Sequence, residues 1–274
     1  MGTNHMGRQS IRFPQPPVVR GFASVAGKKE REGPLGDQFT ATVQDTTFGE
    51  KSWERAERRM QQMTLELALE KAGLTDADLD AAFAGDLLNQ CIGSSFSLRN
   101  RGVPTLGLYG ACSTMAESLL LAAMSVSGGY ARTALAMTSS HFASSERQYR
   151  FPLGYGGQRT PTSQWTVTGA GAVLLGGGER GIRITAATIG SIVDRGICDA
   201  NNMGAAMAPA AASTLLHYFA DTHTEPQEFD CIYTGDLGQV GSSLLRELLA
   251  AEGLLVKNHV DCGCILFDAA EQQV

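Results

Sequence analysis

Residues 74–95 read LTDADLDAAFAGDLLNQCIGSS, and residues 224–243 read TEPQEFDCIYTGDLGQVGSS. The two stretches share a short apolar run that ends in Gly-Asp-Leu, at residues 81–85 in the first and at residues 231–235 in the second. A run of this length followed by a turn and a helical pattern is typical of a strand in an α/β unit. The chain is therefore predicted to hold two copies of one α/β unit, because self-similarity at this scale indicates a repeated architecture.

The alignment of the two copies places similar residues in matching positions. Thr75 aligns with Thr224 as the residue that begins a short turn. Three residues later, Asp78 and Gln227 can return the hydrogen bond of a capping box. The match therefore extends from the strand into the turn that precedes it.

Glycines, serines and apolar spacing outline the rest of the first copy. Ser52 is expected to cap a helix that Gly73 ends, since the apolar residues between them step by three and four. Residues 113–126 predict a helix that is apolar on nearly all sides and must be covered on nearly all sides, which favours a position between two sheets. Strands are predicted at residues 18–25, 106–109, 132–138, 169–175 and 182–192, and the pattern of residues 106–112 returns loosely at 260–266.

The predicted fold class is α/β, with a layered αβαβα arrangement built from two tandem α/β repeats. The halves are expected at residues 1–180 and 181–274. About 65 residues follow the Cys112 strand end in the first half, whereas ten follow Cys264 in the second. The second repeat is therefore predicted to be incomplete at its C-terminus, without its last helix and strand.

Composition excludes several classes of function. The 274 residues include 22 basic and 28 acidic side chains, for a net charge of −6, and no dense basic stripe, so nucleic acid is not an expected partner. No segment resembles a signal peptide or a transmembrane helix. The six cysteines lack CxxC spacing, which is typical of a protein from a reducing compartment.

Two patterns could suggest a metal or a cofactor, and both are interpreted otherwise. Cys262 and Cys264 form a CxC within an apolar run, which favours two buried structural thiols over a metal clip. The glycines of GAGAVLLGGG, residues 169–178, flank a strand instead of opening a helix, so they do not predict dinucleotide binding. We expect no metal and no cofactor.

Longer strings carry a family resemblance. They are AGDLLNQ (84–90), GACST (110–114), SSHFASSERQYRFPLGYGGQ (139–158), GAAMAPAAA (204–212) and TGDLGQVGS (234–242). Two α/β repeats with a cysteine at the entrance of a buried helix resemble the thiolase and ketoacyl-synthase fold. The strings, over residues 7–274, resemble the stage V sporulation protein AD family.

The resemblance implies a function as well as a fold. It implies a non-enzymatic protein that binds dipicolinic acid (pyridine-2,6-dicarboxylate), alone or as its calcium chelate, and supports dipicolinate uptake into the forespore during sporulation. It also implies a peripheral location at the inner membrane of the forespore or spore, on integral membrane subunits of the spore dipicolinate channel. A homodimer paired through residues 106–109 and a chain that continues past residue 274 are further expectations.

Cys112 decides between two interpretations of the site. It follows a predicted strand and precedes a predicted helix, so its sulfur is expected near N–H groups of Ser113 and Thr114 that stabilise a thiolate or bind an anion. In thiolase-like enzymes such a cysteine is the nucleophile, and a histidine from the second repeat assists it. The matching strand end, residues 234–239, carries Asp236 and no histidine. A degenerate site that binds a ligand is therefore favoured, and a thiolase-like or ketoacyl-synthase-like acyltransferase that uses Cys112 as nucleophile is the alternative.

Two aspartates stand at equivalent strand ends, where open α/β sheets bind ligands. The resemblance places Asp86, together with Asn89, in the lining of the site. Asp236 is interpreted as a helix cap. If calcium accompanies the ligand, Asp86 could supply an oxygen to complete its coordination.

His141 begins a segment of about 25 residues without clear periodicity, which predicts a functional loop. A planar aromatic dianion needs charge-assisted donors and a flat apolar wall. His141 and Arg147 are the expected donors for its carboxylates, beside the N–H groups of Ser113 and Thr114. The same segment offers aromatic and further basic side chains: Tyr149, Arg150, Phe151, Tyr155 and Arg159.

Overall fold

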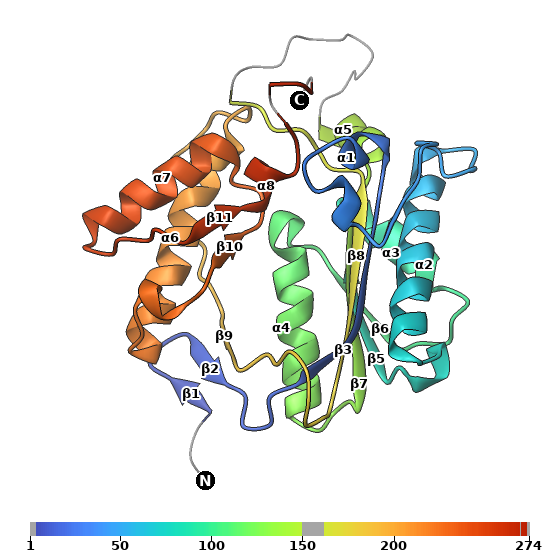
Figure 1. Ribbon diagram of the computed structural model, residues 1–274, viewed down its shortest axis with the longest axis horizontal. Helices are drawn as coiled ribbons and strands as arrows, with labels where there is room; N and C mark the ends of the chain where they lie inside the picture. Colours follow the sequence, from blue (N-terminus) through green and yellow to red (C-terminus); the bar gives the residue numbers. More distant parts are fainter. Residues whose placement is uncertain (1–3, 150–161, 269, 273–274) are drawn as a thin grey trace. The chain divides into compact units, whose positions relative to one another are not determined.

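The apolar run at residues 81–85 forms strand β5 (Ala81–Gly85) of a six-stranded mixed sheet (Figure 1). The computed structural model describes residues 4–149, 162–268 and 270–272. The sheet belongs to a larger unit, Phe13–Gly156 with Thr166–Thr185, and the rest of the chain forms a smaller unit. The predicted division of the chain into two repeats at residue 180 is a different division from these compact units, and it stays a prediction.

The carboxyl ends of three parallel strands meet at one end of this sheet. Its strand order is β4 (Ala41–Thr42), β3 (Val18–Ala26), β8 (Gly169–Gly176), β7 (Thr133–Ser140), β5 and β6 (Thr105–Leu108). Strands β7, β5 and β6 run parallel, whereas β8 is antiparallel to both of its neighbours. Gly85 is paired with Thr138 on one side and with Leu108 on the other, so the segments that follow these residues start side by side.

Two long helices cover opposite faces of the sheet (Figure 1). Helix α2 (Trp53–Ala72) begins at Ser52, which caps it as predicted, and ends at Gly73 in the left-handed conformation. Helix α4 (Thr114–Ser127) packs against β5 and β7. Gly21 of β3 lies under α2, where an added Cβ would stand 2.7 Å from the carbonyl oxygen of Ala68, so this contact requires a glycine. A second sheet over α4 stays a prediction.

The first part of the segment after β7 is helical, at residues Phe142–Tyr149, where the sequence predicted a loop. Short helices α1 (Lys28–Arg31), α3 (Ile92–Leu98) and α5 (Phe142–Tyr149) complete the larger unit. Helix α5 starts directly after His141, because the His141 ring accepts a hydrogen bond from the N–H of Ala143 and caps the turn. The expected loop residues Arg150, Phe151, Tyr155 and Arg159 lie outside the described residues.

The smaller unit contains two small sheets and three α-helices among its described residues. Strands β1 (His5–Met6), β2 (Ser10–Arg12) and β9 (Ala186–Thr188) form an antiparallel sheet, and β10 (Ile232–Thr234) pairs in parallel with β11 (His259–Asp261); the helices are α6 (Met203–Thr222), α7 (Gly238–Ala251) and α8 (Cys262–Ile265). The strand predicted at residues 182–192 is thus confined to β9. Helices α6 and α7 cross at Gly204 and Gly241, where an added Cβ on Gly241 would stand 2.8 Å from the Gly204 Cα.

The turn before the repeated strand is also repeated, but one residue away from the predicted alignment. Thr75 and Asp78 form the expected capping box. In the second copy, the box is formed by Glu225 and Glu228, so the prediction of Thr224 and Gln227 was wrong. Glu225 follows Thr75 by 150 residues, the same separation as between Asp86 and Asp236. The two copies therefore align from turn to strand end without a gap.

The prediction of two buried thiols at Cys262 and Cys264 was wrong. Cys262 is exposed and Cys264 is half-buried. The strand ends at Asp261, and the helical turn that follows carries both cysteines out of the sheet. Within the described ranges, no group of three or more His, Cys, Asp and Glu side chains is placed to hold a metal ion.

Candidate functional site

Cys112 lies in a tight turn between β6 and α4. The turn is a single 3-10 turn, Ala111–Ser113, and Ala111 has a positive φ of 48°, a conformation that costs free energy for a residue with a Cβ. The Cys112 thiol is exposed and forms no disulfide. The predicted strand–cysteine–helix order is therefore observed.

The N–H groups expected to hold an anion beside Cys112 are used inside this turn. The Ser113 N–H donates to the Gly110 carbonyl at 3.1 Å, and the Thr114 N–H donates to the Ala111 carbonyl. The hydroxyl groups also close the turn, since Ser113 Oγ donates to Gly110 and Thr114 Oγ1 donates to Ala111, both at 2.8 Å. An incoming anion would have to replace these bonds or use donors elsewhere.

A carboxylate stands next to the same turn. Glu117, the one charged residue of α4, places Oε2 2.6 Å from where a Cβ on Gly110 would lie, and Ser113 Oγ is equally close to that point. Its negative charge opposes a thiolate or a free dianion at Cys112. Glu117 was not among the residues predicted from the sequence.

Asp86 follows β5 and is buried, with an exposed fraction of 1%. Its carboxylate accepts hydrogen bonds from the Leu88 N–H at 3.0 Å and from the N–H and the hydroxyl of Ser94, both at 2.7 Å. Asp86 thus caps the start of α3 and holds the connecting segment. Asn89, in that segment, is exposed.

A chain of buried polar side chains links Asp86 to α2. Ser94 Oγ lies 3.1 Å from Gln61 Nε2, which also donates to Ser139 Oγ at 2.7 Å. Ser139 in turn donates to Glu57 Oε1 at 2.8 Å, and Ser144 donates to Glu57 Oε2 at 2.8 Å. Burial and then the nearby charge of Asp86 raise the pKa of Glu57 to about 7. Two buried carboxyl groups, those of Asp86 and Glu57, are therefore connected through Ser94, Gln61 and Ser139.

The sequence reasoning missed Glu57 and Gln61, although a signal for them exists. They stand four residues apart on α2, on the stripe that also carries Ala56, Met60 and Leu65 into the core. A charged residue inside an apolar stripe indicates a buried partner.

His141 is buried, with an exposed fraction of 2%, and both of its ring nitrogens are engaged. Nε2 lies 2.7 Å from the carbonyl oxygen of Thr46, so it carries the proton, and Nδ1 accepts from the Ala143 N–H at 3.2 Å. Burial lowers the pKa of His141 below its usual value. The neutral His141 ring therefore links the carbonyl of Thr46 to the N–H of Ala143 at the start of α5.

Arg147 points to the start of α2. It forms an ion pair with Glu54, and its guanidinium lies 5.6 Å from the centre of the Trp53 ring. The described contacts of Arg147 thus join α5 to α2.

Parallel strands bring Asp86, Asn89 and Cys112 to the same end of the sheet. The role of these three residues in ligand binding stays a prediction, as does that of Ser113, His141 and Arg147.

In the smaller unit, the cap of α7 comes from a residue other than Asp236. Asp261 of β11 accepts from the N–H groups of Leu237 at 3.1 Å and Gly238 at 2.9 Å. Asp236 is exposed, and its interpretation as the helix cap was wrong. Thr234 donates to Asp261 at 2.6 Å and lies 2.8 Å from Nε2 of His259. The carboxylate that caps α7 therefore comes from β11, the strand paired with β10, and not from the residue that follows β10.

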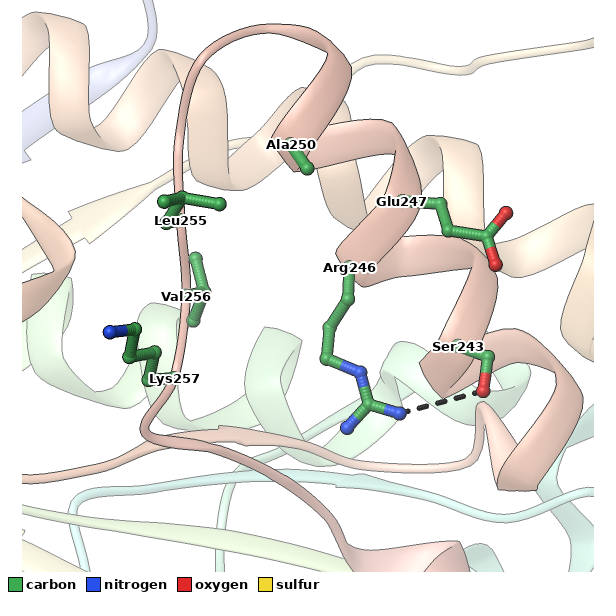
Figure 2. A pocket seen from close by; sticks show the side chains of 7 residues that line it. All are labelled: Ser243, Arg246, Glu247, Ala250, Leu255, Val256 and Lys257. Atoms are coloured by element: carbon green, nitrogen blue, oxygen red, sulfur yellow. Dashed lines mark hydrogen bonds between the residues drawn. The ribbon is translucent and has the colours of Figure 1, made fainter.

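A hollow beside α7 is separate from all predicted site residues. Its volume is about 370 Å³, and Figure 2 shows Arg246 of α7 and Lys257 of the following segment on its facing sides. Arg246 lies 3.5 Å from the hydroxyl of Ser243. The hollow carries both charge signs, since Glu247 also lines it.

Solved structures of similar fold define the class of protein. 3-Oxoacyl-[acyl-carrier-protein] synthase III from Aquifex aeolicus has a TM-score of 0.56 and 13% identity over 89% of this chain and 83% of that chain. The Xanthomonas campestris OleA E117D structure bound with cerulenin has a TM-score of 0.64 and 14% identity over 93% of this chain and 84% of that chain. The chain therefore has the thiolase-like α/β fold, as predicted.

Sequence comparison identifies the family within that class. The profile of the stage V sporulation protein AD (SpoVAD) family matches residues 7–274. Stage V sporulation protein AD of Bacillus subtilis (strain 168) is 43% identical over 267 residues, which cover 97% of this chain and 79% of the relative. This chain belongs to the SpoVAD family and is a sporulation protein.

Proposed function

We propose that this protein binds dipicolinic acid without catalysis and supports its uptake into the forespore. Membership of a sporulation family supports the setting. The observation that carries the non-enzymatic part is the state of His141, the one histidine between Phe13 and Thr185. A cysteine nucleophile needs a base that can take its proton. His141 is buried and bonded through both nitrogens, so it does not supply that base.

The alternative is a thiolase-like acyltransferase with Cys112 as nucleophile. It is favoured by the exposed thiol at the strand–helix junction and by the likeness of the fold to a protein named as a 3-oxoacyl synthase. The other four histidines, His5, His217, His223 and His259, belong to the smaller unit.

The geometry supports a ligand that meets the turn from its exposed side. Asn89, Cys112 and Ser113 are exposed at this end of the sheet, and the Ser113 oxygen can accept a hydrogen bond while its proton is donated to Gly110. Asp86 acts through the segment it caps, since its oxygens already accept three hydrogen bonds. Arg147 joins the ligand only by leaving Glu54.

The carboxylate of Glu117 favours the calcium chelate of dipicolinate over the free dianion. A free dianion is repelled by Glu117, whereas calcium neutralises the ligand and accepts a further carboxylate oxygen. Calorimetric titration of the full chain with dipicolinate is expected to show saturable binding that calcium strengthens about tenfold, or about 1.4 kcal/mol.

Two controls make that titration specific. Benzene-1,3-dicarboxylate has the same shape but lacks the ring nitrogen that chelates calcium, so calcium is expected to leave its binding unchanged. Glu117→Gln should remove the calcium effect and tighten binding of the free dianion. Absence of saturable heat with dipicolinate at millimolar concentration, with and without calcium, would refute the proposed function.

We propose a homodimer paired through the β6 edge. Strand β6 is the last strand of the sheet, and two large side chains are exposed in it or directly after it: Leu106 by 53% and Tyr109 by 55%. The double variant Leu106→Asp, Tyr109→Asp is expected to be monomeric at micromolar concentration by light scattering, where the unchanged protein is dimeric. Tyr130→Asp, at a residue that is 88% exposed after α4, is the control. A monomeric unchanged protein would contradict this arrangement.

None of the helices in the described ranges combines the length and the apolar character needed to cross a membrane. We propose that the protein lies peripherally at the inner membrane of the forespore or spore and docks on integral membrane subunits of the dipicolinate channel. High salt is then expected to release it from isolated spore membranes.

A further inference from the structure

A second pocket in the larger unit lies between the start of α2 and the exposed face of α3. Its volume is about 330 Å³. Three arginines and two apolar side chains line most of it: Arg55, Arg58, Arg99, Ile92 and Phe96. None of these residues belongs to the proposed dipicolinate site.

The pocket carries an excess of positive charge. The two carboxylates at its margin are engaged: Glu50 pairs with Arg58 at 3.1 Å, and Glu54 pairs with Arg147. Arg58 also has a buried Nε with no hydrogen-bond partner among the described residues. This nitrogen is closed to solvent, so a bound oxyanion would meet the positive charge of the pocket and not this atom.

The backbone adds to this charge. Helix α2 has 20 residues and begins at the pocket, with Ser52 as its cap. The cap bond from the Arg55 N–H to Ser52 Oγ is long, at 3.4 Å. The positive end of a helix favours anions and has free N–H groups in its first turn.

The apolar side of the pocket consists of two large side chains, Ile92 and Phe96. Ile92 and Phe96 are each 43% exposed, although they are large apolar residues. The Arg99 guanidinium lies 5.1 Å from the centre of the Phe96 ring, which holds that cation at the pocket wall.

We propose that this pocket binds a small aromatic dianion through carboxylate or phosphate oxygens. Arg55, Arg58 and Arg99 pair with the oxyanions, since guanidinium groups match both carboxylate and phosphate geometry. Ile92 and Phe96 contact the ring. The pocket is separate from the Cys112 turn, although its proposed ligand class includes dipicolinate.

Trp53 fluorescence provides the measurement, because Trp53 lies directly before Glu54 in α2. The full chain with Trp165→Phe, which leaves Trp53 as the one tryptophan, is titrated with phenyl phosphate and with benzene-1,3-dicarboxylate. We expect saturable binding of at least one of them, weakened by salt, and no response to neutral benzene-1,3-dicarboxamide. The stronger ligand shows whether the pocket prefers phosphate or carboxylate.

Paired variants assign the response to the pocket. The double variant Arg55→Gln, Arg99→Gln is expected to raise Kd at least about tenfold, which corresponds to about 1.4 kcal/mol. Arg59→Gln is the matched control on the same helix, since Arg59 pairs with Glu66 outside the pocket. Equal Kd values for the unchanged protein and the double variant, or no saturable signal with either dianion at millimolar concentration, would overturn the proposal. Dipicolinate calorimetry on the double variant separates this result from the proposed function, because the Cys112 turn is unaltered.

Discussion

Asp86→Ala is expected to lower the free energy of unfolding by about 3 kcal/mol, because buried donors lose their acceptor. The substitution leaves the N–H of Leu88 and both the N–H and the hydroxyl of Ser94 without the carboxylate that now accepts from them. Urea unfolding of the full chain, followed by circular dichroism, measures the change. The same variant should also lose order in the segment that carries Asn89.

The control for this prediction is Asp37→Ala. Asp37 is an exposed aspartate of the same unit, and its removal is expected to change stability by less than about 0.5 kcal/mol. If Asp86→Ala were as mild as the control, Asp86 would not be the structural cap that its hydrogen bonds indicate.

Stability is expected to fall as the pH rises from about 4.5 to about 7, through the ionisation of Glu57. The pKa of Glu57 is raised to about 7 in the folded protein, mainly by burial, so the folded state holds a proton that the unfolded state releases near pH 4.5. The favourable contribution is complete below the unfolded pKa and is lost as the pH passes the folded pKa. Its size is up to about 3 kcal/mol, because one pKa unit corresponds to 1.36 kcal/mol.

Glu57→Gln isolates this effect from other groups. His141 and His259 have lowered pKa values and therefore favour the folded state increasingly as the pH rises toward 6.5, which opposes Glu57. The unfolding free energy of Glu57→Gln minus that of the unchanged protein should therefore increase as the pH rises from about 4.5 to about 7. A constant difference from pH 5 to pH 8 would show that Glu57 does not retain its proton.

The repeated α/β pattern was visible in the sequence because it depends on local residue types. The capping residue Ser52, the terminating Gly73 and the strand that ends at Gly85 occur where expected. The alignment of the second turn failed by one residue, because Thr224 looks like a better cap than Glu225, which the structure uses. A constant separation of 150 residues from Thr75 and from Asp86 would have identified Glu225.

The site was harder to predict because its chemistry depends on contacts between distant residues. The sequence placed Asp86 and Cys112 each after a predicted strand, and the parallel pairing of β5 and β6 brings both to one end of the sheet. No local pattern shows that the oxygens of Asp86 are used by Ser94, or that Arg147 pairs with Glu54. The burial of Glu57 depends likewise on partners 82 and 87 residues away in the sequence.

The absence of acyl transfer at Cys112 is the central claim, and intact mass measurement tests it most directly. The full chain is incubated with acetyl-CoA and with a longer acyl-CoA, beside Cys112→Ala, and both proteins are weighed. The account predicts unchanged masses, because the histidine nearest in sequence to that thiol is already bonded through both ring nitrogens. A gain of one acyl group that Cys112→Ala abolishes would contradict the account and establish a working nucleophile.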